Sequence, residues 1–136
     1  MKRKSWLKIV FWAFLIVFIA ITLEMVFEWL MGPFFIPSIL IFFLLGIVML
    51  VLTFRENTKG WLKKFLILMS SSAVLFFISV VLHNAYYAFG TLTECIVLTT
   101  WLGILEVAFF LIAVISCPIA FVVGLVGSII FLFRKK

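Results

Sequence analysis

Charged residues are scarce in this chain of 136 residues, of which Asp, Glu, Lys and Arg together make up 12%. A soluble domain averages about 25% charged and about 45–50% apolar residues, whereas 68% of this chain is hydrophobic. The shortage of charge excludes a water-soluble globule, and the high hydrophobicity excludes intrinsic disorder. Two cysteines are too few for a disulfide-stabilised scaffold. The composition therefore indicates one small membrane domain.

Four hydrophobic stretches are long enough to cross a bilayer as helices. A hydrocarbon core of about 30 Å needs roughly 20 apolar residues at 1.5 Å per residue. The predicted spans are residues 7–31, 36–54, 65–83 and 106–133. The sequence thus predicts an all-α fold in which residues 1–136 form a single transmembrane bundle of four helices.

The second half of the chain contains two less regular segments. Residues 85–95 mix Tyr, Gly, Thr and Glu without Lys or Arg, and we expect them to form an interfacial loop. Residues 95–103 are expected to be an interfacial or re-entrant lead-in to the last span. Pro118 lies inside that span and is expected to bend it, because proline interrupts the helical hydrogen bonds.

The basic residues predict the topology. All 11 Lys and Arg residues lie within residues 2–8, 55–64 and 134–136. Because cytoplasmic segments of membrane proteins are enriched in Lys and Arg, we expect both termini and the middle stretch to be cytoplasmic. The protein would then be a multi-pass plasma-membrane protein that meets anionic lipid at its cytoplasmic face. Nucleic-acid binding is not expected, since no folded surface presents these charges.

The acidic residues predict a polar cluster on the opposite side. Glu24, Glu28, Glu94 and Glu106 are four of the five acidic residues, and no Lys or Arg lies on that side to neutralise them. A carboxylate inside a membrane costs about 2.5–3.5 kcal/mol on insertion scales. We therefore expect Glu24, His83 and Glu106 to lie within side-chain reach of one another. The full predicted cluster is Glu24, Glu28, His83, Asn84, Tyr87 and Glu106.

Small residues recur at helical spacing and predict faces where helices pack closely. One face of the first span carries Ala13 and Ala20 below Glu24. The last span carries a longer set. Its members are Ser116, Cys117, Ala120, Gly124, Gly127 and Ser128.

The pattern bears on three kinds of activity. No cofactor is predicted; a divalent cation is possible, with Glu24, Glu28, His83 and Glu106 as candidate ligands, because imidazole and carboxylate bind such ions. Cation or proton transport is the alternative function, since acids inside a membrane often mark transport pathways. Enzymatic activity is not expected, because no catalytic motif is present. The favoured role is an accessory or scaffold protein that associates with itself or with a larger membrane partner.

Parts of the second half resemble a known group of proteins. The segments that carry the likeness are Leu82-His83-Asn84, the stretch from Glu106 to Cys117-Pro118, and Gly124-Leu-Val-Gly-Ser128. They resemble an uncharacterised group of small prokaryotic integral membrane proteins with four spans. In that group the Glu follows the His-Asn pair more closely than here, where residues 91–103 intervene. The resemblance implies a four-helix membrane fold and no particular activity.

Overall fold

The computed structural model describes residues 3–26, 35–56, 58–93 and 95–133, and its regular elements are all helical. The helices are α1 (Arg3–Val26), α2 (Phe35–Arg55), α3 (Gly60–Leu92), α4 (Ile96–Leu111) and α5 (Cys117–Phe133), with the π-helical turn η2 (Ile112–Ser116) joining the last two. Four stretches are long and apolar enough to cross a membrane, because α4, η2 and α5 form one continuous rod. The predicted all-α fold of four helices is confirmed. The composition and the helices together are those of a multi-pass membrane protein.

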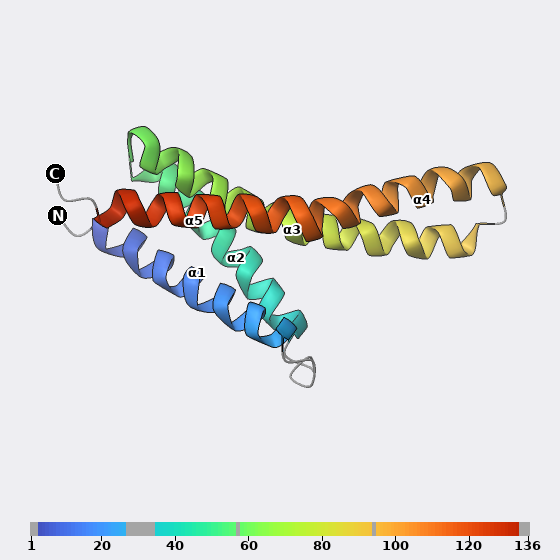
Figure 1. Ribbon diagram of the computed structural model, residues 1–136, viewed down its shortest axis with the longest axis horizontal. Coiled ribbons are helices and arrows are strands. Elements are labelled where there is room, and N and C mark those ends of the chain that lie inside the picture. The colour runs from blue at the N-terminus through green and yellow to red at the C-terminus, as the bar shows by residue number, and fades with distance from the viewer. Residues whose placement is uncertain (1–2, 27–34, 57, 94, 134–136) are drawn as a thin grey trace.

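Both helices of the second half are longer than a bilayer requires. At 1.5 Å per residue the 33 residues of α3 extend about 50 Å, and the 38 residues from Ile96 to Phe133 extend about 57 Å, against a hydrocarbon core of about 30 Å. By contrast, α1 and α2, of 24 and 21 residues, extend about 36 and about 32 Å. Figure 1 shows the hairpin of α3 and α4 continuing well past the end of the other two helices.

Two expectations for this hairpin were wrong. Residues 85–92 continue α3 as a helix and do not form a loop. Residues 96–103 are the regular start of α4, so the re-entrant form of the expected lead-in is wrong. No proline interrupts either segment, and α3 packs along α4. A short connection therefore joins two long helices, α3 and α4. Each helix satisfies its backbone hydrogen bonds internally and packs one face against the other helix.

The predicted irregularity at Pro118 takes the form of a π-helical turn. Proline has no backbone N–H, so a helical carbonyl one turn earlier loses its donor. In the structure the backbone N–H of Cys117 donates to the carbonyl of Ile112, five residues earlier. The wider π-helical turn accommodates Pro118 without breaking the helix. Figure 1 shows that the rod changes direction in this region.

The interior of the bundle is built largely from phenylalanine. The rings of Phe14 and Phe18 (α1) each contact those of Phe42 (α2) and Phe121 (α5), and Phe42 also contacts Phe121. The closest pair is Phe18 and Phe121, with centroids 4.3 Å apart. Such tilted and edge-on arrangements are favourable for aromatic pairs. This aromatic cluster joins α1 to the rest of the bundle, although the backbone of α1 runs close only to that of α2 among the described elements.

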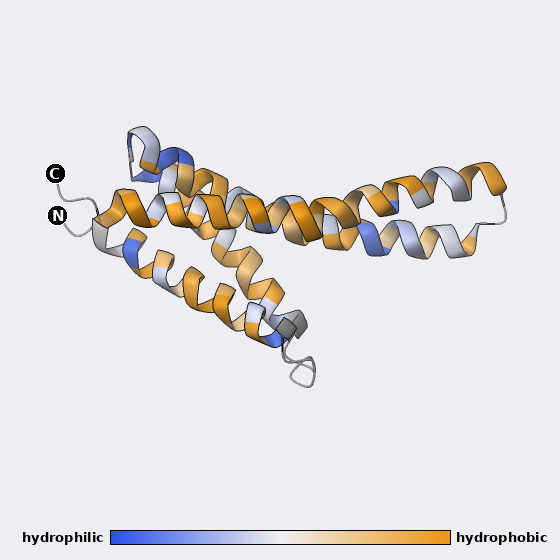
Figure 2. Cartoon of the chain, viewed as in Figure 1, coloured by the Kyte–Doolittle hydropathy of each residue, from blue (hydrophilic) through white to orange (hydrophobic). Residues whose placement is uncertain are grey.

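Closest packing occurs between α3 and α5. A methyl group added at Gly124 would lie 2.6 Å from the backbone nitrogen of Met69, and one added at Gly127 would overlap the ring of Phe65. Only glycine therefore permits this approach of the two helices. The described basic residues lie near the ends of helices. Figure 2 shows hydrophobic colour over most of each helix, with hydrophilic colour at the turn between α2 and α3 and on a short part of α3.

Candidate functional site

Glu24 reaches its hydrogen-bond partner on the neighbouring helix. The Ser38 hydroxyl of α2 donates to Oε1 of Glu24 at 3.2 Å, and Oε2 of the same carboxyl group is buried without a partner among the described residues. The packing of α1 on α2 brings these two side chains together. Ser38 is the one polar residue in the first half of the second span, and this could have identified it as the partner.

His83 and Glu106 form a second polar site, between α3 and α4. Nδ1 of His83 lies 3.2 Å from the backbone oxygen of Glu106 and 3.9 Å from its Oε1. A carbonyl oxygen only accepts hydrogen bonds, so Nδ1 carries the hydrogen and donates it there. This leaves Nε2 as an acceptor in the neutral ring or a donor in the charged ring. The side chains of both residues are 27% exposed.

The structure does not bring Glu24 to His83 and Glu106, so the predicted single cluster is wrong in this respect. The rise per residue gives the depth of a side chain along its own helix, but it does not give the direction in which one helix runs relative to another. In Figure 1, α1 and α2 slope away from the hairpin of α3 and α4, and Glu24 is bonded to α2. Two separate polar sites replace the predicted one.

The remaining members of the predicted cluster take other positions. Asn84 is exposed and donates to the carbonyl of Val80 within its own helix, and Tyr87 is exposed on α3. Glu28 lies outside the described residues. The described part of the chain contains no group of three His, Cys, Asp or Glu side chains placed to hold a metal ion.

The predicted packing residues divide into two groups. Cys117, Gly124, Gly127 and Ser128 are buried in α5, with Ala120 and Ala13 half-buried. Ala20 and Ser116 are exposed, so these two do not pack against the other helices of the same chain, and their contact with another helix stays a prediction. On α1, large residues pack instead, including Phe11 and Phe14, because the aromatic cluster fills the space between helices.

One face of α4 was not recognised in the sequence. The residues on it are apolar, exposed and spaced alternately by four and three positions: Val97, Trp101, Ile104, Ala108, Leu111 and Ile115, the last in η2. The five large side chains are 46–67% exposed. Glu106, Phe110 and Ala113 lie towards α3, and at 3.6 residues per turn this places the six on the opposite side. We call these six residues the α4 seam.

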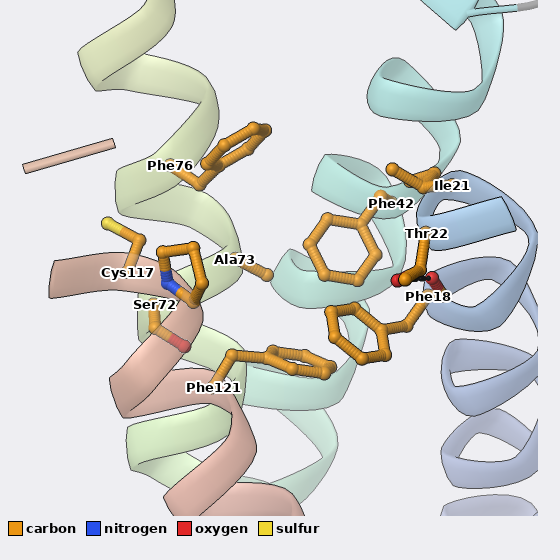
Figure 3. Close-up of a pocket in the computed structure, with 10 residues that line it drawn as sticks. Phe18, Ile21, Thr22, Phe42, Ser72, Ala73, Phe76, Cys117 and Phe121 are labelled. Atoms are coloured by element: carbon orange, nitrogen blue, oxygen red, sulfur yellow. Dashed lines mark hydrogen bonds between the residues drawn. The ribbon is translucent and has the colours of Figure 1, made fainter. Parts of the chain in front are cut away.

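Two cavities adjoin along α3 and share Phe76 and Pro118 as lining residues. The first, of about 290 Å³, lies among α1, α2, α3 and α5, and Figure 3 shows Phe18, Phe42 and Phe121 along it with Phe76 and Cys117 across from them. The second, of about 280 Å³, continues between α3 and α4 and is lined by His83 at one end. The sequence offered no direct sign of either cavity.

No protein-family model matches the chain, and no curated protein or solved structure matches it.

Proposed function

We propose that this protein is a self-associating membrane protein of the accessory or scaffold type, with the α4 seam as its interface. The proposal is carried by one observation: six apolar side chains with a seven-residue repeat lie exposed on the face of α4 opposite α3. Such a repeat suits packing against another helix, because alternate spacings of four and three keep one face towards the partner. Trp101, the largest member, is 62% exposed.

The position of the seam along the rod supports a protein partner over lipid. Val97 lies 36 residues from Phe133, about 54 Å along the helix, and a tilt of about 40° still leaves about 41 Å across the membrane. The hydrocarbon core is only about 30 Å thick. The outer part of the seam would therefore extend beyond the lipid chains, where an apolar patch is stable only when another surface covers it.

A second copy of the chain is the partner that best fits the seam. Every seam residue is uncharged and apolar, so the face is complementary to itself and needs no opposite charge. Two copies inserted in the same orientation are related by an axis along the membrane normal, which sets each residue of the seam beside its own counterpart. The proposed interface is thus a parallel pair of α4 helices.

The proposed orientation follows from charge. With residues 55–64 and both termini cytoplasmic, as the positive-inside tendency favours, the hairpin of α3 and α4 projects outwards from the plasma membrane. Lys8, Arg55, Lys59 and Lys64 are exposed, and Figure 1 shows the start of α1 at the same end of the bundle as the turn between α2 and α3. This arrangement supports contact with anionic lipid on that side.

Disulfide crosslinking tests the interface. In a Cys95→Ser, Cys117→Ala background, Trp101→Cys in isolated membranes should form a dimer on mild oxidation. Leu98→Cys is the matched control, because Leu98 is 49% exposed on the same helix but lies off the seam. Equal crosslinking at both positions, no crosslinking at either, or a product joined to another protein would each contradict pairing through the seam.

A second candidate function, cation or proton handling, is supported by the buried Oε2 of Glu24, which has no partner among the described residues. Acids placed in this way are often part of transport pathways. The separation of Glu24 from the His83 and Glu106 site weakens this candidate, since Glu24 contacts Ser38 on α2 while His83 contacts Glu106 on α4. Proteoliposome flux that is equal in wild type, Glu24→Gln and Glu106→Gln would dismiss this function.

A further inference from the structure

We infer that the two adjoining cavities form a groove for one phospholipid, in the leaflet remote from the basic residues, whose headgroup carries a primary ammonium. The groove is independent of the α4 seam. Its apolar part follows α3 from Ser72 through Phe76 and Val80, and its outer end is lined by His83.

The length of the groove matches one leaflet. Ser72 and His83 are 11 residues apart on α3, about 16 Å, and half of a hydrocarbon core is about 15 Å. Ser72 lies eight residues beyond Lys64 and His83 nineteen, about 12 and about 28 Å from that end. The groove therefore runs from near the middle of the bilayer to its surface.

The volume and lining of the groove suit a hydrocarbon chain. The cavities measure about 290 and about 280 Å³, and an apolar cavity of about 150 Å³ already holds a benzene molecule. Phe76 and Pro118 border both. Because the hydrocarbon region contains no water to fill an apolar groove, an acyl chain is the occupant that the surrounding bilayer supplies.

The headgroup class follows from Glu106. Its carboxyl oxygen Oε1 lies 3.9 Å from His83 at the end of the groove, and the sequence contains no Lys or Arg between Lys64 and Arg134. A primary ammonium donates up to three hydrogen bonds and would supply the positive charge that this side lacks. A quaternary ammonium has no hydrogen to donate, and an anionic headgroup would be repelled by the carboxylate.

Native mass spectrometry of the full-length protein with added lipid tests the headgroup. Wild type should retain phosphatidylethanolamine about tenfold more strongly than phosphatidylcholine, the difference expected for a charge-assisted hydrogen bond. Glu106→Gln should remove this preference, and Glu56→Gln, a carboxyl group at the basic end, should leave it unchanged. Equal retention of the two lipids by wild type, preference for phosphatidylglycerol, or an unchanged preference in Glu106→Gln would overturn the assignment.

Two variants within the groove test its apolar part. Val80→Phe should abolish retention, whereas Val81→Phe should not, because Val81 is 50% exposed and lies outside the groove. Val114→Phe is a second variant with the same expected loss; Val114 lines the groove but is 53% exposed, so the bundle should tolerate a larger side chain there. Retention by both Val80→Phe and Val114→Phe at the level of Val81→Phe would overturn the groove.

Discussion

Replacing Gly124 by alanine should separate α3 from α5 and destabilise the bundle. The added methyl carbon would lie 2.6 Å from the nitrogen and 2.9 Å from the Cα of Met69, whereas ordinary contacts at such a position lie at 3.4–4 Å. Both atoms belong to the backbone and cannot rotate away, so the helices themselves must move. Overpacking costs about 1–3 kcal/mol, and because the clash here is with backbone atoms we expect a cost of about 3 kcal/mol.

The net effect is smaller because alanine favours the helical state. Glycine costs about 1 kcal/mol relative to alanine in a helix interior, so Gly124→Ala should lower the free energy of unfolding by about 2 kcal/mol. Gly103→Ala is the matched control in α4, since no atom lies within 4 Å of its added methyl group. That variant should raise the free energy of unfolding by about 1 kcal/mol.

An intermediate substitution completes the series. A methyl group at Gly46 would lie 3.2–3.3 Å from its nearest neighbours, among them the backbone oxygen of Ser70, and its strain should roughly cancel the gain in helix propensity. Unfolding in mixed micelles, followed by the loss of helical circular dichroism, measures all three variants. If Gly124→Ala proved as stable as Gly103→Ala, the close contact of α3 with α5 would be refuted.

Three further predictions concern single side chains. Phe121→Ala should lower the free energy of unfolding by about 3–5 kcal/mol, because this ring is 2% exposed at the centre of the aromatic cluster; a loss below 1 kcal/mol would contradict that position. Ser38→Ala should cost about 1–3 kcal/mol by removing a donor to Glu24, and the same unfolding assay would show no change if the contact were absent. Cys117 is buried and should resist a soluble maleimide until the protein unfolds, so labelling of the folded protein at the rate of an exposed thiol would argue against its burial.

Features that depend on local sequence were predictable. The hydrophobic stretch at residues 36–54 differs from α2 by one residue at each end. Pro37 is tolerated there because it lies in the first turn of the helix, and Arg55 follows the last apolar residue. Pro118 indicated the irregular turn, since a missing N–H disturbs any helix. The long hairpin was not predicted. The thickness of a bilayer gives the minimum length of a membrane-spanning helix, but it does not determine where that helix ends.

Positions that depend on packing between helices could not be read from the sequence. Glu24 lies 16 residues beyond Lys8 and His83 lies 19 residues beyond Lys64, about 24 and about 28 Å from the basic ends of their helices. These similar depths do not bring the two side chains together, because α1 packs on α2 and Glu24 contacts Ser38. The pairing of His83 with Glu106 depends on the register of α3 against α4, which neither helix specifies alone. Likewise, α4 is apolar on most of its surface, and the six seam residues can be told from the others only once the face that packs on α3 is known.

Thiol labelling from one side of the membrane tests the proposed topology most directly. Cys95 is exposed at the tip of the hairpin, and Lys59 is exposed at the turn between α2 and α3. A membrane-impermeant maleimide added to intact cells should label Cys95 in the Cys117→Ala protein, and should label Lys59→Cys in the protein without native cysteines only after the membrane is opened. Labelling of Lys59→Cys in intact cells, with Cys95 protected, would contradict the proposed orientation and the outward projection of the hairpin.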